Sequence, residues 1–433
     1  MTKLTILLYN LFISPLFILA SHIGALLHKK VRAGVMGRYR TFPRIKNYFI
    51  QNPRRADVPL FLFHCASMGE FEHIKPLLAK FKQKLPQSRI VVMFFSPSGF
   101  QNISDFPTVD LFIYSPMDIW YRVNRLYEQL KPTAVFIAKH DVWPNQVWVA
   151  QKRRIPVFMI NASLHKASSR IRPVIRTFQR TVYDKFNRIF IIAESDKLRW
   201  EILSDKNRVM EVGDTKYDQV LYRCQESRQK KWLPEHFTRG NFVFVAGSTW
   251  PEDETHIFTA VSRLLRFYPK LRVVICPHEP GESRLFQLRQ TYSEFETELY
   301  SQAGEECKAR ILLVDKIGIL ANIYSEAHLA YVGGSFRQNI HNVLEPAVYG
   351  IPVMFGPVNQ NSHEAQLLKK CGGGVEIPNG HELRVLLDRF MQEENFRKRV
   401  GDKARRMVVT HSGSTERTLK AIFSELGLKP TAS

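Results

Sequence analysis

The segment PLFLFHCASMGE, residues 59–70, decides the fold class. It opens with a continuous apolar run, Pro59–His64, and passes through a turn to Gly69 and Glu70. A short apolar run without polar alternation is typical of a parallel strand that is buried on both faces. A glycine followed by a carboxylate then favours a strand-to-helix turn. The segment therefore predicts the beginning of an α/β domain.

Similar runs recur through both halves of the chain. Those in the first half are Ile90–Phe95, Asp110–Tyr114, Ala134–Ala138, Pro156–Asn161 and Arg188–Ala193. Those in the second half are Phe242–Ala246, Arg272–Cys276, Arg310–Val314, His328–Val332 and Ile351–Phe355. Between the halves lies the polar segment Arg223–Gly240, which we interpret as a linker. Alternation of strands and helices predicts two doubly wound α/β domains, with ligands at the carboxyl ends of the strands.

The N-terminus carries a mostly apolar segment, Leu4–Leu27, which is long enough to cross a bilayer but contains several polar residues. Basic residues follow it directly, namely Lys29, Lys30, Arg32, Arg38 and Arg40. By the positive-inside rule, this flank holds the rest of the chain in the cytoplasm. We predict a membrane anchor over residues 1–28. The sequence leaves open whether it crosses the membrane, lies on it as an amphipathic helix, or is a buried core helix.

Composition limits the architecture and the partners. The 433 residues, 45% hydrophobic and 12% aromatic, suffice for two packed cores, which we place at residues 29–225 and 226–433. The net charge of +22 fits an anionic membrane surface, an acidic substrate or nucleic acid. The five cysteines form no C-x-x-C pair, which favours a reducing compartment.

One segment, Lys166–Arg188, is especially basic. Arg172, Arg176 and Arg180 recur every four residues, so on a helix they form one stripe. This pattern fits either a solvated helix face or contact with anionic lipid or a phosphorylated acceptor.

The residues that follow the predicted strands carry the chemistry. Glu70 stands at a helix N-terminus, where it is a candidate general base for a sugar hydroxyl or a simple complement to the helix dipole. In the second half, Thr249 and Glu252 have the spacing of a capping box, and the free amides beside them suit a phosphate.

Two further strand ends, Cys276–Pro280 and Gly333–Ser335, precede the segment Asn342–Pro346, whose Glu345 is placed to accept hydrogen bonds from a ribose diol. Together these features favour a nucleotide-sugar site. The sequence has no P-loop, G-x-G-x-x-G, H-E-x-x-H or D-x-D motif, and its fourteen histidines show no metal-ligand spacing. We therefore predict no required metal or other cofactor.

The order of these motifs resembles that of the 3-deoxy-D-manno-octulosonic acid (Kdo) transferases, which add Kdo to the lipid A precursor of Gram-negative bacteria. The matching motifs are S-x-G-E at Ser67–Glu70, W-P-N at Trp143–Asn145, N-A-x-L at Asn161–Leu164, G-x-x-K at Gly213–Lys216, G-S-T at Gly247–Thr249, G-G-S at Gly333–Ser335 and H-N-x-x-E-P at His341–Pro346. Together with the predicted anchor they cover essentially the whole chain.

The resemblance implies a GT-B fold and an inverting, metal-independent transfer of Kdo from CMP-Kdo to lipid IVA, at the cytoplasmic face of the inner membrane and with no nucleic acid partner. Glu70 matches the family's catalytic base, and Asp141 and Lys216 match positions that stabilise charge in the transition state. The positions implied to bind CMP-Kdo are Ser248, Thr249, Pro277, His278, Ile317, Gly318, Ile319, Gly334, Ser335, Asn342, Val343, Leu344 and Glu345.

The sequence also departs from the family pattern. Lys139-His140-Asp141 stands where many relatives read E-T-E, and His278 stands where an arginine is common. These departures leave the number of Kdo units and the details of the acceptor open. Two alternatives remain beside this reading: another GT-B nucleotide-sugar transferase or sugar-nucleotide epimerase, and a basic membrane-bound protein that binds polyanions without catalysis.

Overall fold

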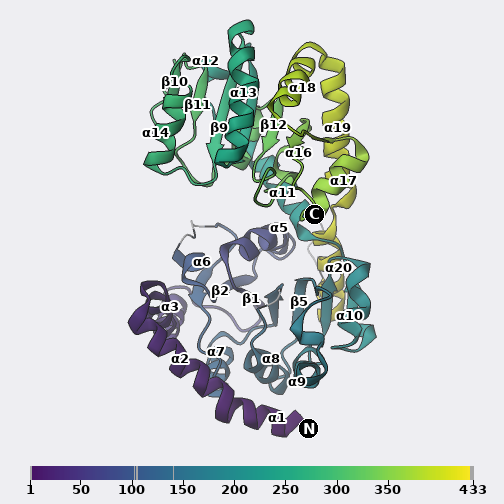
Figure 1. The fold of residues 1–433 in the computed structure, drawn as a ribbon. Helices are drawn as coiled ribbons and strands as arrows, with labels where there is room; N and C mark the ends of the chain where they lie inside the picture. Colours follow the sequence, from purple (N-terminus) through teal and green to yellow (C-terminus); the bar gives the residue numbers. More distant parts are fainter. Residues whose placement is uncertain (1, 102, 104–105, 140, 430–433) are drawn as a thin grey trace. The chain divides into compact units, whose positions relative to one another are not determined.

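The computed structural model describes residues 2–101, 103, 106–139 and 141–429, which form two compact units. The first unit runs to Gln219 and resumes at Ser412, and the second spans Val220–His411. Each unit contains one seven-stranded parallel sheet flanked by helices (Figure 1). The predicted pair of doubly wound α/β domains is thereby confirmed.

In the first unit the strand order is β3-β2-β1-β4-β5-β6-β7, so the direction of winding reverses beside β1. The strands are β1 (Leu60–Cys65), β2 (Arg89–Phe94), β3 (Leu111–Tyr114), β4 (Ala134–Ala138), β5 (Val157–Ala162), β6 (Arg188–Ile191) and β7 (Val209–Glu211). Alternate residues of β1 supply two different cores: Leu60 and Leu62 pack in one, and Phe61 and Phe63 in the other. This two-sided burial explains why the run shows no polar alternation.

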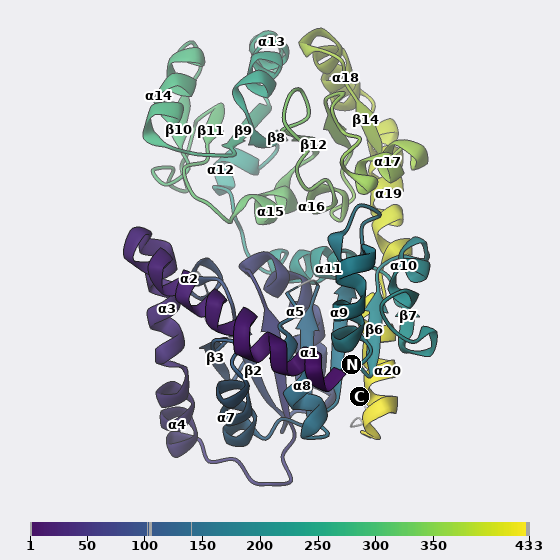
Figure 2. The same cartoon turned by 60° about the horizontal axis from the view of Figure 1, so that its bottom comes forward.

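The helices of the first unit cover both faces of its sheet. They are α3 (Lys29–Tyr39), α4 (Thr41–Gln51), α5 (Met68–Lys84), α6 (Pro97–Gln101), α7 (Trp120–Leu130), α8 (Pro144–Lys152), α9 (Pro173–Tyr183), α10 (Lys197–Glu201) and α20 (Ser414–Leu426). Ahead of them, α1 (Thr2–Leu8), a π-helical turn (Tyr9–Ile13) and α2 (Ser14–Leu27) form one continuous helix that lies along this unit (Figure 2).

The second unit repeats the plan with the order β10-β11-β9-β8-β12-β13-β14, which reverses beside β8. Its strands are β8 (Phe242–Thr249), β9 (Leu271–Pro277), β10 (Thr297–Leu299), β11 (Ile311–Leu313), β12 (Leu329–Val332), β13 (Val353–Phe355) and β14 (Gly374–Glu376). Its helices are α12 (Glu235–Thr238), α13 (Pro251–Phe267), α14 (Glu282–Thr291), α15 (Leu320–Ile323), α16 (Leu344–Ala347), α17 (His363–Cys371), α18 (Gly380–Gln392) and α19 (Glu394–His411).

Every predicted apolar run coincides with a strand, but three strands had not been predicted. These are β7, β10 and β14, each three residues long and each at an outer edge of its sheet. An edge strand of three residues is too short to give a continuous apolar run, because only one side of it is paired and little of it is buried.

The compact units differ from the predicted domains 29–225 and 226–433 in two places. The division falls inside α11 (Thr215–Ser227), ahead of the segment interpreted as a linker, and α20 returns to the first unit. Asp218 caps α20, since its carboxylate accepts the main-chain N–H groups of Gly413 and Thr415 at 2.8 and 3.1 Å. Phe423 then packs edge-on against Phe81 of α5, at 5.4 Å between ring centroids. The C-terminal helix therefore completes the first core.

Candidate active site

Glu70 lies in the first turn of α5, directly after the central strand β1. Its Oε2 accepts a hydrogen bond from the main-chain N–H of Ala66 at 2.5 Å, which holds the carboxyl group over the helix N-terminus. Burial raises the pKa of Glu70 above its ordinary value, although this hydrogen bond and the cations His64 and Lys139 oppose the rise. A carboxylate with a raised pKa is suited to general base catalysis near neutral pH.

A second carboxylate, Asp141, faces β1 from the loop after β4. His64 is fully buried near the end of β1, and its Nε2–H donates to Asp141 Oδ2 at 2.8 Å. Burial alone raises the pKa of Asp141, but the hydrogen bond and charge of His64 outweigh it and hold the pKa below its usual value. Because β1 and β4 meet where the strand order reverses, Glu70 and Asp141 lie at the position where open α/β sheets bind ligands.

Two lysines complete the cluster. Lys139 directly follows β4 in a left-handed conformation with φ of 55°, and burial lowers the pKa of its ammonium group. Asp214 and Glu70 oppose that shift, whereas the charge of Lys216 adds to it, so each of these three groups lies within electrostatic reach of Lys139. Lys216 Nζ lies 3.1 Å from Asp214 Oδ2. His140, which precedes Asp141, lies outside the described residues.

The loop that presents Lys216 is fixed from β5. Asn161 at the end of that strand is buried and adopts φ of 58°, and its Oδ1 accepts the main-chain N–H of Thr215 at 3.1 Å. Gly213 turns the chain with φ of 86° just before the loop. The N-A-x-L and G-x-x-K motifs are thus two sides of one contact, and they place Lys216 at the same end of the sheet as Glu70 and Asp141.

In the second unit, Asp253 connects the two loops that flank the strand reversal. Its fully buried carboxylate accepts the main-chain N–H of Trp250 at 2.9 Å and of Gly334 at 2.8 Å, and the hydroxyl of Tyr331 at 2.5 Å. The predicted capping box of Thr249 and Glu252 is therefore wrong by one residue, because Trp250 is the N-cap of α13 and Asp253 its partner.

The loop after β12 also approaches the loop after β8 closely. A Cβ atom on Gly333 would lie 2.3 Å from the carbonyl oxygen of Ser248, so only glycine fits there. Ser248 itself adopts φ of 54°, and Gly334 adopts φ of 81°. The G-S-T and G-G-S motifs meet at this contact, which leaves little room for side chains between the two strand ends.

A stack of three rings borders these loops. The rings of Trp250 and His278 lie 4.9 Å apart and those of His278 and His341 4.4 Å apart, each pair nearly parallel. Trp250 Nε1–H donates to His341 Nε2 at 3.1 Å, so a neutral His341 carries its proton on Nδ1. Burial and the neighbouring His278 lower the pKa of His341.

Several of the residues implied to bind CMP-Kdo have buried side chains, namely Thr249, Pro277, Ser335, Val343 and Leu344. The hydroxyl of Thr249 donates to Glu254 at 2.7 Å. The hydroxyl of Ser335 donates to the Val332 carbonyl at 3.0 Å and accepts the Gly356 N–H at 2.7 Å. These positions can therefore meet a ligand only through main-chain atoms, and Pro277 has no N–H to offer.

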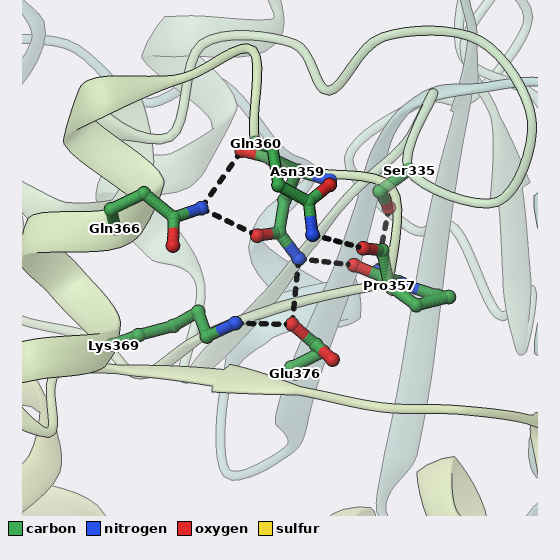
Figure 3. A network of polar contacts seen from close by, with 8 residues as sticks. Ser335, Pro357, Asn359, Gln360, Gln366, Lys369 and Glu376 are labelled. Carbon is green, nitrogen blue, oxygen red and sulfur yellow. Dashed lines mark hydrogen bonds and ion pairs between the residues drawn. The ribbon is translucent and has the colours of Figure 1, made fainter.

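The loop after β13 is fixed by a buried amide (Figure 3). Asn359 Nδ2 donates to the Gly356 carbonyl at 2.9 Å and to Glu376 Oε2 at 2.8 Å, and its Oδ1 accepts from Gln366 Nε2 at 2.6 Å. Since Gly356 in turn donates to Ser335, this network also holds the G-G-S loop.

The remaining implied positions are accessible. Ile317 is 87% exposed, and Gly318 has φ of 89° with open space where a Cβ would lie. Ile319 forms the N-cap of α15. Asn342 is exposed, and its Nδ2 lies 3.3 Å from Glu345 Oε1 at the beginning of α16. An acidic and an amide group on one exposed turn fit the hydrogen-bonding needs of a ribose diol.

No group of three or more His, Cys, Asp or Glu side chains arranged to hold a metal ion occurs within residues 2–101, 103, 106–139 and 141–429.

Comparison with known proteins shows which family the chain is similar to. Residues 38–219 match the sequence profile described as 3-deoxy-D-manno-octulosonic-acid transferase (kdotransferase). The chain is 27% identical to the 3-deoxy-D-manno-octulosonic acid transferase of Aquifex aeolicus, over 81% of this chain and 91% of that protein. It is also 27% identical to the enzyme of Chlamydophila psittaci, over 89% and 88%, and 24% identical to that of Haemophilus influenzae, over 82% and 84%. The chain is related to the Kdo transferases over most of its length. It is accordingly a glycosyltransferase.

Solved structures agree on the fold of this chain. UDP-GlcNAc 2-epimerase from Neisseria meningitidis matches with a TM-score of 0.58 over 84% of this chain and 99% of that structure, at 13% sequence identity. A glycosyltransferase from Rickettsia africae matches with a TM-score of 0.54 over 86% and 99%, at 9% identity. At such identities the likeness concerns the fold alone, and it confirms the predicted GT-B class.

Sequence reasoning missed several residues of the two clusters. His64 looked like the end of an apolar strand, and Lys139 looked like a departure from the family pattern rather than a partner of Glu70. Asp253 and His341 attracted no attention as single residues. One clue was available for His64 and Asp253: a charged or titratable residue inside or next to a continuous apolar run must be paired when it is buried.

Proposed function

We propose that the chain transfers Kdo from CMP-Kdo to lipid IVA with inversion at the anomeric carbon and without a metal ion. The observation that carries the proposal is the cluster of Glu70, Asp141, Lys139 and Lys216 at the strand reversal of the first unit. It contains a desolvated carboxylate, whose pKa is raised, beside fixed charges of both signs. A displacement by a sugar hydroxyl requires such groups, namely a general base and charges that stabilise the transition state.

In the proposed reaction Glu70 takes the proton of an acceptor hydroxyl. The oxygen then attacks the anomeric carbon of Kdo as the bond from that carbon to the phosphate oxygen breaks, and CMP leaves with the bonding electron pair. The hydrogen bond from Ala66 keeps the Glu70 carboxylate at the beginning of α5, which supports a base that is positioned before the substrate arrives.

Asp141 and the lysines act on charge. An oxocarbenium-like centre gains positive charge as CMP leaves, and the anionic Asp141, kept ionised by His64, stabilises it. Lys139 and Lys216 counter the negative charge of the carboxylate that Kdo carries. Lys139 thus stands where relatives often carry an acidic residue, so the site of this chain has a different distribution of charge.

The donor is assigned to the second unit and the lipid to the first. Ser248, His278, Gly334 and the exposed turn at Asn342 would contact CMP at the strand reversal beside β8. In the first unit, the helix Lys3–Leu27 is long and apolar enough to cross a membrane, and most of it is not buried. We assign the protein to the cytoplasmic face of the inner membrane, where a lipid acceptor would be found.

Transfer is tested with the purified full-length chain in detergent, supplied with CMP-Kdo and a tetra-acylated, bis-phosphorylated lipid A precursor. Mass spectrometry counts the Kdo units added. We expect product from the wild type and a loss of roughly 10²–10⁴-fold in rate for Glu70→Gln, the range that general base catalysis supplies. Glu72→Gln is the matched control, because Glu72 lies on the same helix but pairs with Lys75.

No product from a folded wild-type chain, with CMP-Kdo intact, would contradict the proposal and favour another nucleotide sugar. A panel of UDP-sugars would then separate the remaining GT-B chemistries. Full activity of Glu70→Gln would instead keep the reaction but remove Glu70 from it. Parallel reactions with and without EDTA test the metal-independent mechanism, which predicts equal rates.

A further inference from the structure

The N-terminal helix reverses the usual distribution of polar and apolar residues. Its polar side chains at Tyr9, Asn10 and Ser14 point into the first unit. Its outer face consists of large apolar side chains that are 45–75% exposed: Leu4, Leu7, Leu8, Leu11, Phe12, Ile13, Leu16, Leu19, Ile23, Leu26 and Leu27. A helix at an aqueous surface has the opposite arrangement, so this outer face is built for an apolar medium.

Hydrogen bonds fix the inner face to the folded unit. Tyr9 OH donates to Asp118 Oδ2 at 2.8 Å, and Ser14 Oγ donates to the Asp118 carbonyl at 2.7 Å. Asn10 exchanges two hydrogen bonds with Asn145 at the beginning of α8, at 3.0 and 2.9 Å. The π-helical turn Tyr9–Ile13 adds a residue, so that Tyr9 and Ser14 both face Asp118.

Aromatic packing extends the attachment along the helix. The Tyr9 ring lies 5.4 Å from that of Trp148 and 5.9 Å from that of Phe178 on α9. Farther along, Phe17 lies 5.0 Å from Trp143. Contacts are thus spread over more than two turns on one side. A helix fixed in this way cannot be surrounded by lipid, and to cross the bilayer it would have to carry a charged, folded surface into the hydrocarbon.

The charges next to the helix indicate the kind of lipid. A cavity of about 550 Å³ opens between α3, α4 and α6, and its lining includes Lys29, Arg32, Arg40 and Arg44. No acidic side chain lines this cavity, and within the described residues none forms an ion pair with these four. Clustered cations beside an apolar face match an anionic headgroup layer above an acyl layer.

We propose that Lys3–Leu27 lies flat within a single leaflet of an anionic phospholipid bilayer, held parallel to the surface by its attachment to Asp118 and Asn145. The apolar outer face enters the acyl region, and the basic cavity lies at the level of the phosphates. The helix is then an in-plane anchor rather than a span. The orientation of the helix is argued independently of the proposed function. Only the role of the anchor, which is to keep the enzyme beside a lipid acceptor, rests on that function.

The geometry also connects the anchor with the catalytic cluster. Trp143, which packs on Phe17, stacks on Phe95 at 4.9 Å and stands two residues after Asp141. Arg38 donates to the Phe95 carbonyl at 2.6 Å and is among the cations that lower the pKa of Asp141. An in-plane helix therefore holds the end of the sheet that carries Asp141 near the headgroups, within reach of a hydroxyl that stays on its lipid.

Depth measurements distinguish the two orientations. Single cysteines replace Leu7, Leu11, Leu16, Leu19 and Ile23 in the full-length Cys371→Ser chain, whose other cysteines are buried. After spin labelling, each variant is bound to vesicles of phosphatidylethanolamine and phosphatidylglycerol, and depth is obtained from the relative accessibility to oxygen and a nickel chelate. An in-plane helix places all five labels within about 5 Å of one depth. A spanning helix separates Leu7 from Ile23 by about 24 Å along the bilayer normal, at 1.5 Å per residue.

A depth profile that is deepest at Leu16 and shallow at both ends would overturn the proposal. Binding provides a second test. Leu16→Gln/Leu19→Gln is expected to weaken sedimentation with these vesicles by roughly tenfold or more, because two exposed leucines lose their transfer into lipid. The matched control Phe267→Gln/Phe286→Gln changes two equally exposed apolar residues of the second unit and should leave sedimentation unchanged.

Vesicles of pure phosphatidylcholine, which carry no net charge, test whether binding depends on anionic lipid. Equal binding to these vesicles would contradict the proposal that the bilayer is anionic. None of these measurements contains a sugar donor or acceptor. An in-plane profile without Kdo transfer would therefore refute the proposed function alone, and transfer with a spanning profile would refute this inference alone.

Discussion

Both sheets reverse their strand order beside a central strand, β1 in the first unit and β8 in the second, yet the residues at the two reversals differ in kind. In the first unit the strand ends carry the ionisable side chains Glu70, Lys139 and Asp141. In the second, glycines bring main-chain atoms together around one buried carboxylate, Asp253.

We interpret this difference as a division of roles, with catalysis in the first unit and nucleotide recognition in the second. Side chains with shifted pKa values can exchange protons or stabilise charge, whereas rigid main chain and stacked rings can hold a nucleotide without reacting. We therefore expect substitutions in the first unit to change turnover and leave CMP affinity alone, and substitutions in the second unit to change stability or affinity. The following predictions test that division.

The largest effect is expected from Asp253→Ala. It removes the acceptor of three buried donors, on Trp250, Gly334 and Tyr331, and should lower the free energy of unfolding by about 3–5 kcal/mol. Calorimetry should show the loss as a lower transition temperature, together with loss of CMP binding. Glu252→Ala is the control: its partner Arg337 is exposed, so the cost should stay under about 1 kcal/mol. If the two substitutions lower the free energy of unfolding equally, Asp253 does not stabilise the two loops as proposed.

Asp141→Asn should have the next largest effect, on turnover. The substitution keeps the shape of the side chain but removes the charge that faces His64, so we expect kcat to fall roughly tenfold to a hundredfold. CMP affinity, measured by calorimetric titration, should be unchanged because we assign CMP binding to the second unit. Asp57→Asn, which removes an exposed partner of Arg55, is the control. A parallel loss of CMP affinity would show that the division between the units is too strict.

Lys139→Met should shift the pH dependence of catalysis. The charge of Lys139 lowers the pKa of Glu70, so its removal raises that pKa further above the ordinary value. Because Glu70, as the proposed base, acts only when ionised, the acidic limb of kcat/KM should move to higher pH. Lys131→Met is the control, since Lys131 also has a positive φ but contributes no charge to Glu70. If the acidic limb of the Lys139→Met profile stays at the wild-type pH, Lys139 does not influence the pKa of Glu70.

Whether a feature of this molecule can be predicted from the sequence depends on how far apart in the sequence the interacting residues lie. Continuous apolar runs identify every buried strand of both sheets, because burial on both faces is a local property of the residues. The edge strands β7, β10 and β14 leave no such pattern, and the return of α20 depends on capping by Asp218, which is remote in sequence. The same holds for the sites. Motifs located Glu70, whereas the pairing of His64 with Asp141 and the stack of His278 on His341 exist only once the chain is folded.

The smallest predicted effect concerns His278, which stands where an arginine is common in the family, and the ring of His341 stacked on it. The pKa of His341 is lowered by burial and by His278, so near neutral pH the His341 ring offers an anion little charge, and its protonation at lower pH supplies that charge. CMP affinity should therefore rise a few-fold, roughly three- to tenfold, between pH 7.5 and pH 5.5. His278→Arg should bind CMP more tightly at pH 7.5 and lose most of that dependence, because a guanidinium stays charged throughout.

His381→Arg serves as the matched control for this comparison, because His381 is an exposed residue of α18 in the same unit. Titration calorimetry of all three proteins over the same pH series removes the ligand's own protonation, which is common to them. If the wild type and His278→Arg show the same pH dependence, the stack does not contact the phosphate. The charge for CMP must then come from another side chain, and the second unit would share with the first the use of ionisable groups at its strand reversal.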